Sequence, residues 1–294
     1  MTRGASPGAA VKPPRIVLGL APFLGFALLF LLVPLLGLLV SAFQVPVPGS
    51  PGETAFGLQN FALSVSGAQG ESILNSLQVS LTAAMIGTVC GALIAQAVVT
   101  LGSGRLNSAT AVLATVLANS GGISLAFSFI VVLGSVGLLT GVLGLEALGF
   151  SLYSSGGLVL MYQYFLIPTM VMLFLPTLQG VRQEWREAAA SLGAPAHQFW
   201  GRVGLPVVMP SLISGFVLLF GASFATHVSA AALIGGANFP LVTLKIAGLL
   251  TGGNSSGQEN VAMALSVNMI VIALITLAIS LPLQKRSRQW LSSK

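Results

Sequence analysis

The sequence has no aspartate, only six glutamates and a single cysteine among its 294 residues. Charged residues of both signs make up 6% of the chain, whereas hydrophobic residues make up 55% and the mean hydropathy is +0.95. So little charge excludes an ordinary soluble domain. One cysteine, Cys90, allows no intrachain disulfide. The composition therefore predicts an all-α, polytopic membrane protein.

The common catalytic motifs are also missing. The chain has no Gly-rich loop that ends in Gly-Lys-Ser or Gly-Lys-Thr, no metal-binding spacing of His, Glu and Cys, and no Gly-x-Ser-x-Gly elbow. We therefore expect no catalytic residue, no metal and no cofactor in this chain, and no ATP hydrolysis by it. The net charge of +6 does not indicate nucleic-acid binding, because the basic residues lie in short segments between apolar runs.

Six apolar runs are long enough to cross a membrane as helices. They cover approximately residues 17–43, 77–99, 110–133, 157–179, 212–233 and 261–283. The expected division of the chain is a disordered tail (1–15), an N-terminal transmembrane helix (16–43), an extracytoplasmic loop (44–74), a five-helix core (75–284) that contains a polar loop (180–206), and a basic tail (285–294). Gly87 and Gly91 have small-xxx-small spacing and predict a helix-packing face.

Lysine and arginine indicate the orientation, because cytoplasmic loops of membrane proteins are enriched in them. With both termini in the cytoplasm, 11 of the 12 basic residues lie inside and only Lys245 lies outside. This orientation also places the polar loop 180–206 in the cytoplasm.

That loop predicts two short helices joined by a tight turn. Residues 183–192 are rich in helix-forming residues, Gly193 is a natural helix stop, and Pro195 suits the first turn of a second helix. Aromatic residues Trp185, Phe199 and Trp200 are candidate anchors for a docked protein. The alternative is an ordinary solvated loop between two spans.

The same loop resembles the "EAA" loop of permease subunits from type I, binding-protein-dependent ABC importers. The matching residues are Glu187, Ala188, Ala189, Gly193, Val203, Leu205 and Pro206. The resemblance implies that these residues, with Trp185 and Trp200, form a coupling helix between spans four and five. It also implies two separate ATP-binding subunits that hold ATP and Mg, a second permease copy or homologue, and an extracytoplasmic solute-binding protein, all at a bacterial inner membrane.

Shorter patterns resemble the permeases for polyamines, ferric iron, thiamine or phosphonates. They are Ala21-Pro22-Phe23-Leu24, Leu32-Val33-Pro34-Leu35, Leu58-Gln59-Asn60-Phe61 and Leu233-Ile234-Gly235-Gly236. Related polyamine permeases carry an acid in the fifth span, but residues 221–227 contain none. A cationic substrate is therefore disfavoured, and an anion or a polar neutral solute stays open.

Polar residues inside the apolar runs are candidates for a substrate pathway, because polar groups at membrane depth need a partner or a watery cavity. The candidates are Asn119, Ser120, Ser124, Gln163, Ser223, Thr226 and His227. Tight helix packing through Gly and Ser is an equal alternative for residues 119–124, as is a neutral imidazole bonded to a neighbouring helix for His227.

A stand-alone channel or secondary carrier is the competing class of function. A carrier driven by an ion gradient usually needs a carboxylate within a span, and none is expected here. A membrane-embedded enzyme is disfavoured because no catalytic cluster is present. The sequence leaves open the substrate, whether the partner permease is identical or different, and whether substrate binds within the membrane.

Overall fold

The computed structural model describes residues 20, 22–47, 49–50, 53–145, 147, 149–235, 239–252 and 258–292, with side chains as far as Pro282. The tail expected at 1–15 lies outside these residues. Strands are limited, in the described part, to a hairpin of β1 (Gln44–Pro46) and β2 (Thr54–Phe56). The helices are η1 (Leu28–Leu32, π-helical), α2 (Val33–Phe43), α3 (Gln59–Ser64), α4 (Gly67–Thr100), α5 (Gly104–Ala118), α6 (Ile123–Leu133), α7 (Leu138–Leu143), α8 (Ser155–Gln179), α9 (Gln183–Ser191), α10 (Ala196–Phe199), η2 (Trp200–Gly204, π-helical), α11 (Leu205–Ala225), α12 (Val228–Ile234), α13 (Val242–Thr251) and α14 (Gln258–Ser292).

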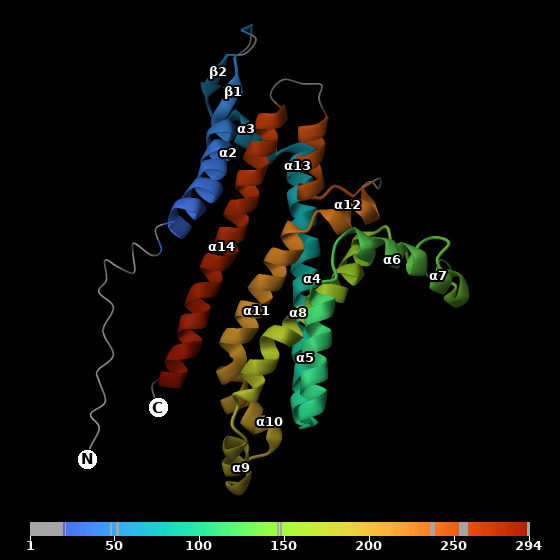
Figure 1. Ribbon diagram of the computed structural model, residues 1–294, viewed down its shortest axis with the longest axis vertical. Coiled ribbons are helices and arrows are strands. Elements are labelled where there is room, and N and C mark those ends of the chain that lie inside the picture. The colour runs from blue at the N-terminus through green and yellow to red at the C-terminus, as the bar shows by residue number, and fades with distance from the viewer. Residues whose placement is uncertain are drawn as a thin grey trace, which may run out of the picture.

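The predicted all-α membrane architecture is confirmed. Six described helical segments are long and apolar enough to cross a membrane: 22–43, 67–100, 123–143, 155–179, 196–225 and 258–282. Figure 1 shows the long helices running together, with α9 and α10 at one end of the bundle and the β1–β2 hairpin at the other. The chain is a multi-pass membrane protein.

The centre of the bundle is the contact of α4 with α8 and α11. Leu158, Met161, Leu166 and Met170 of α8 are fully buried there. The association of helices in lipid gains little free energy from the hydrophobic effect and depends on close packing. Gly91 of α4 allows this approach, because a Cβ atom at this position would lie 2.5 Å from the Met170 Cβ and 2.9 Å from a backbone oxygen of α8. The packing face predicted at Gly87 and Gly91 is therefore the α4–α8 contact.

The third apolar run is not one helix, contrary to the expectation for residues 110–133. It breaks between α5 and α6, where Gly122 has φ +88°. That angle is accessible to glycine but not to an ordinary helical residue. After the break, α6 and α7 project sideways from the bundle (Figure 1). A hydropathy count detects the apolar composition of this run but not the change of direction.

The fifth run is also broken. Instead of one span over 212–233, α11 begins at Leu205 and ends at Ala225, and α12 follows at Val228. Thr226, between them, has an extended backbone (ψ 121°). His227 therefore lies at a helix break and not inside a continuous span.

Two expected boundaries also change. The loop expected at 44–74 contains the hairpin, α3 and the first two turns of α4, because residues 67–76 continue the helix that carries the second span. The basic tail expected at 285–294 is not separate from the last span, because the backbone of α14 stays helical to Ser292.

The N-terminal helix α2 packs against α14 and α3 rather than against the central contact. Its buried residue Ala42 shares a small apolar cluster with Ala264 and Val267 of α14. Two asparagines support this attachment. The Asn60 side chain donates to the backbone oxygens of Ala42 and Gln44, at 3.1 and 2.8 Å, and the Asn260 side chain donates to Gln44 O at 2.8 Å.

Candidate functional site

The loop between α8 and α11 forms a helix, a glycine turn and a second helix. Helix α9 ends in a Schellman motif, in which Gly193 N–H donates to Ala190 O and Ala194 N–H donates to Ala189 O, both at 2.9 Å. Gly193 has φ +78°, the left-handed conformation that this motif requires. The predicted helix stop at Gly193 is therefore confirmed, and Pro195 lies at the N-cap of α10.

The second half of the loop is braced by aromatic rings. The Arg186 guanidinium lies over the Trp200 ring, 5.1 Å from its centroid, and 5.9 Å from the Phe199 centroid. The two rings meet edge to face with centroids 5.8 Å apart. Gly204 is buried against the Trp200 ring and leaves no room for a Cβ atom. The π-helical turn η2, a geometry frequent at functional sites, joins this brace to α11.

The predicted coupling residues divide into exposed and buried groups. Trp185 is 39% exposed and Leu192, which the sequence analysis did not select, is 87% exposed. Phe199 is only 5% exposed and belongs to the main core, so its prediction as a docking anchor is wrong. The remaining predicted residues are exposed (Glu187, Ala188, Gly193, Val203, Leu205) or half-buried (Ala189, Trp200, Pro206).

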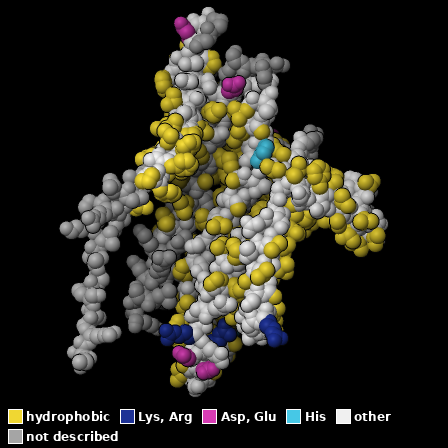
Figure 2. Space-filling model, in the orientation of Figure 1, with side chains coloured by type: hydrophobic (Ala, Val, Ile, Leu, Met, Phe, Trp, Pro, Cys, Tyr) yellow, Lys and Arg dark blue, Asp and Glu magenta, His cyan; other side chains and the backbone are white. Residues whose placement is uncertain are grey.

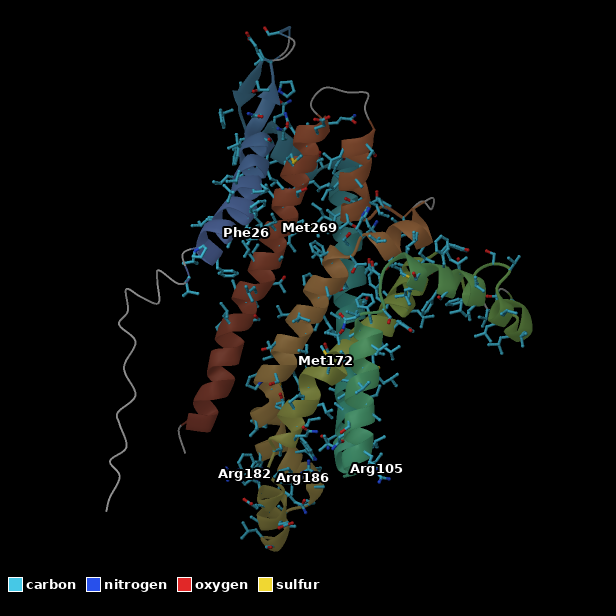
Figure 3. The ribbon with its side chains drawn as sticks, viewed as in Figure 1. Phe26, Arg105, Met172, Arg182, Arg186 and Met269 are labelled. Carbon is cyan, nitrogen blue, oxygen red and sulfur yellow. The ribbon has the colours of Figure 1, made fainter. Side chains whose placement is uncertain are left out.

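The carboxylate of Glu187 accepts a hydrogen bond from the Gln183 side-chain amide at 2.9 Å. Both residues are exposed on α9. Arginines lie at the same end of the molecule: Figure 3 shows Arg182 and Arg186 near α9, and Arg105 at the matching end of α5. Figure 2 shows the Lys and Arg side chains of this face gathered there. The helix–turn–helix thus protrudes from the arginine-rich end of the bundle.

The two helix breaks are hydrogen-bonded to each other. The Ser229 hydroxyl of α12 accepts from Gly122 N–H at 3.1 Å and donates to Gly122 O at 3.0 Å. One side chain of the second break therefore bonds to both backbone groups of Gly122, whose carbonyl also accepts from Ala126 N–H. Ser229 lies 107 residues from Gly122 in the sequence, and no local pattern identified it as a partner.

The predicted pathway residues do not form one cluster. Asn119 and Ser120 lie at the first break and bond to the preceding turn of α5, and Ser124 is exposed in the first turn of α6. Gln163 instead lies in the α4–α8 contact, where its amide donates to Ala83 O and Val159 O and its Oε1 atom is buried without a partner. Gln163 therefore lies in a helix contact and not at either break.

Ser223, Thr226 and His227 lie around the second break. Ser223 is buried and donates to backbone oxygens that include Leu219 O at 2.9 Å. His227 is half-buried at the N-cap position of α12, and its side chain does not cap that helix. A small cavity of about 10 Å³ beside this break is lined mostly by residues that carry a hydroxyl group, namely Ser76, Ser80, Tyr162, Ser223, Thr226 and Thr243.

Comparison with solved structures defines the class of this fold. A chain in the crystal structure of a bacterial ABC transporter that imports the acidic polysaccharide alginate superimposes with a TM-score of 0.72, over 94% of this chain and 96% of that chain, at 18% identity. The alginate transporter in complex with an alginate pentasaccharide-bound periplasmic protein gives a TM-score of 0.69 at 17% identity, over 94% and 95% of the two chains. At these identities the similarity concerns the fold alone.

Particular relatives emerge from sequence comparison. The molybdenum transport system permease protein ModB of Mycobacterium tuberculosis is 29% identical over 156 residues, 53% of this chain and 56% of that protein. ModB of Escherichia coli K12 is 30% identical over 138 residues, 47% and 59% of the two chains. The probable sulfate permease cysT of Prototheca wickerhamii is 27% identical over 124 residues, 42% and 48% of the two chains. No protein-family model matches.

The chain thus spans less than two thirds of the length of the curated relatives that it matches. The resemblance to ABC importer permeases, predicted from the Glu187–Pro206 pattern, is confirmed by these relatives and by the fold. The relatives' names give molybdenum and sulfate, not the polyamine, iron, thiamine or phosphonate expected above. The patterns behind that expectation lie mainly in the N-terminal helix and before α4, away from the two helix breaks.

Proposed function

We propose that this chain is the permease subunit of an ATP-driven, binding-protein-dependent importer in a bacterial inner membrane. The observation that carries the proposal is the Glu187 motif, folded as an exposed helix–turn–helix at the arginine-rich end of a six-segment membrane bundle. A rigid protruding helix with an exposed Trp is suited to fit a groove in a partner protein. The partner is a pair of ATP-binding subunits, which hold ATP and Mg.

The proposed motion starts at this helix. When the ATP-binding subunits close, α9 moves as a lever, and the brace of Arg186, Trp200 and Gly204 passes the movement through η2 to α11. Helix α11 ends at the second break, which is bonded to the first break through α12. Movement of the helix–turn–helix between α8 and α11 therefore reaches both breaks, which line half of a pathway completed by a second permease, identical or homologous.

For the substrate we propose an inorganic oxyanion of the sulfate and molybdate class, delivered by an extracytoplasmic solute-binding protein. The relatives named for molybdenum and sulfate support this class. The chemistry near the breaks agrees with it, because hydroxyl and backbone N–H groups bind oxyanions, and the stretch Gly221–His227 contains no carboxylate to repel one. In this proposal Glu187 makes an ionic or capping contact and is not a catalytic acid.

The docking role is tested by co-purification of the tagged protein with its co-expressed ATP-binding subunit. The test variant is Glu187→Arg, Gly193→Trp. The control is Ser108→Arg, Gly104→Trp on α5, which introduces the same two residue types on an exposed surface; Gly104 has open space around its Cα. We expect the wild type and the control to retain the ATP-binding subunit, and the test variant to lose it.

The substrate class is tested by uptake of radiolabelled molybdate and sulfate into proteoliposomes that contain the assembled complex and a solute-binding protein. We expect uptake only with ATP inside and only with the binding protein outside. Uptake by this chain alone, with an ion gradient and no ATP, would support the alternative of a secondary carrier or channel. If the Glu187→Arg, Gly193→Trp variant retains the ATP-binding subunit, α9 is not the docking element.

A further inference from the structure

A cavity of about 680 Å³ lies between the end of α4 and the start of α9, at the arginine-rich end of the molecule. Its volume falls within the roughly 300–1,000 Å³ that is usual for ligand sites. One wall is apolar and is formed by Val99, Leu178 and Val181. The lining also includes Arg182 and Arg186.

The two arginines lack counter-ions within the described part of the chain. No salt bridge or hydrogen bond of either guanidinium is present there, and the Nε atom of Arg186 is buried without any partner. Arg186 is nevertheless held in place, because its guanidinium lies 5.1 Å from the Trp200 centroid. A guanidinium group without a counter-ion binds anions such as phosphate by charge-assisted hydrogen bonds.

Two features of the cavity oppose an anion. Glu187 lies in the wall, but its carboxylate accepts a hydrogen bond from Gln183, and one acid beside two arginines leaves a net charge of +1. The C-terminal ends of α4 and α8 also lie here. The helix dipole gives each end a partial negative charge of at most about half an elementary charge. Full charges on the arginines, one of them partly buried, outweigh these partial charges for a ligand held between them.

The position of the cavity selects the kind of anion. It lies where α4 and α8 end, and both are membrane-spanning segments, so it faces the level of the lipid headgroups. Apolar lining residues beside two arginines match a lipid acyl chain and its phosphate. Basic pockets between transmembrane helices are sites for anionic headgroups. We propose that this cavity binds the phosphate of one anionic phospholipid, such as phosphatidylglycerol, through Arg182 and Arg186.

This site leaves Trp185 and Leu192 of the loop free to contact a partner. The cavity is lined by the face that carries Gln183, Arg186, Glu187 and Ala190, whereas Trp185 and Leu192 are exposed outside it. A bound lipid would therefore act as a support beneath α9 and fix its angle to α4. The inference concerns the chain in its membrane and does not depend on the proposed ATP-binding partner.

The test is native mass spectrometry of the full chain, released from detergent micelles in the presence of phosphatidylglycerol, phosphatidylcholine or inorganic phosphate. We expect one retained phosphatidylglycerol and no retained phosphatidylcholine. Arg182→Gln, Arg186→Gln should weaken phosphatidylglycerol binding about tenfold or more, since each charge-assisted bond contributes that order of affinity. The conservative variant Arg182→Lys, Arg186→Lys keeps the charges and should retain much of the binding.

The matched control is Arg105→Gln, which removes an exposed arginine at the same end of the molecule but outside the cavity. It should bind phosphatidylglycerol as the wild type does. Equal binding by the wild type and the double Gln variant would overturn the proposal, as would equal loss in the Arg105→Gln control. Displacement of the lipid by millimolar inorganic phosphate would assign the site to a soluble anion. Displacement by added ATP-binding subunit would assign it to the protein interface.

Discussion

Gly204 is the residue on which the geometry of the helix–turn–helix between α8 and α11 depends most directly. A Cβ atom at this position would overlap the Trp200 ring, and that ring is in turn fixed by Arg186 and Phe199. Gly204→Val should force the ring away from Arg186 and destabilise the protein by about 1–3 kcal/mol, the usual cost of overpacking. Thermal unfolding in detergent, followed by Trp fluorescence, measures the loss.

The control for this prediction is Gly201→Ala, three residues away in the same π-helical turn, where a Cβ atom meets open space. It should leave the unfolding temperature unchanged or raise it slightly, because alanine favours helix. Similar destabilisation by both variants would show that the turn, and not the ring contact, is responsible.

At the scale of the element, the contact of α4 with α8 depends on a glycine face. Gly91→Leu would bring a side chain against Met170 and a backbone oxygen of α8, neither of which can move far. We expect the helices to separate and the folded yield in detergent to fall strongly. Gly221→Ala in α11, where a Cβ atom meets nothing within 4 Å, is the matched control and should fold normally. Size-exclusion chromatography distinguishes the two outcomes.

The bond between the two helix breaks is a second feature at this scale. Ser229→Ala removes the partner of the Gly122 N–H group and leaves Gly122 O with only the weaker bond from Ala126 N–H at 3.4 Å, at a cost of about 1 kcal/mol for a half-buried donor. Hydrogen–deuterium exchange around residues 119–124 should accelerate, and substrate uptake should fall. Ser128→Ala, whose hydroxyl bonds only within α6, should change neither. Unchanged exchange in Ser229→Ala would mean that the breaks are held by other contacts.

Elements could be predicted from the sequence where one residue or one continuous run of residues determines them. The stop of α9 at Gly193 follows from one residue's access to positive φ, and the span count follows from run length. The breaks at Gly122 and Thr226 were missed because hydropathy reports composition and not direction. The partner of Gly122 was missed because Ser229 is remote in sequence. Phe199 was misjudged because an aromatic in a polar loop can face the core, as it does here.

At the scale of the whole molecule, a substitution can test how the N-terminal helix α2 is attached to the bundle. Asn60→Ala removes two of the three side-chain hydrogen bonds described at the end of α2 and leaves only that from Asn260, so α2 should separate more often from α14. Disulfide cross-linking of Ala42→Cys with Ala264→Cys, in a Cys90→Ala background, reports the contact. We expect a lower cross-linking yield with Asn60→Ala. Asn107→Ala on α5 is a control that should leave the yield unchanged.

The same attachment constrains the order of events during synthesis. Gln44, at the end of α2, bonds to Asn260, which is 216 residues later in the chain. At about 5–20 residues per second, the ribosome needs roughly 10–40 s to make that intervening chain. Throughout this time the first helix stays in the lipid bilayer without its partner helix. Its surface is almost entirely apolar, unlike the glycine-lined face of α4. The helix can therefore remain in the lipid bilayer during this time without contact with another helix.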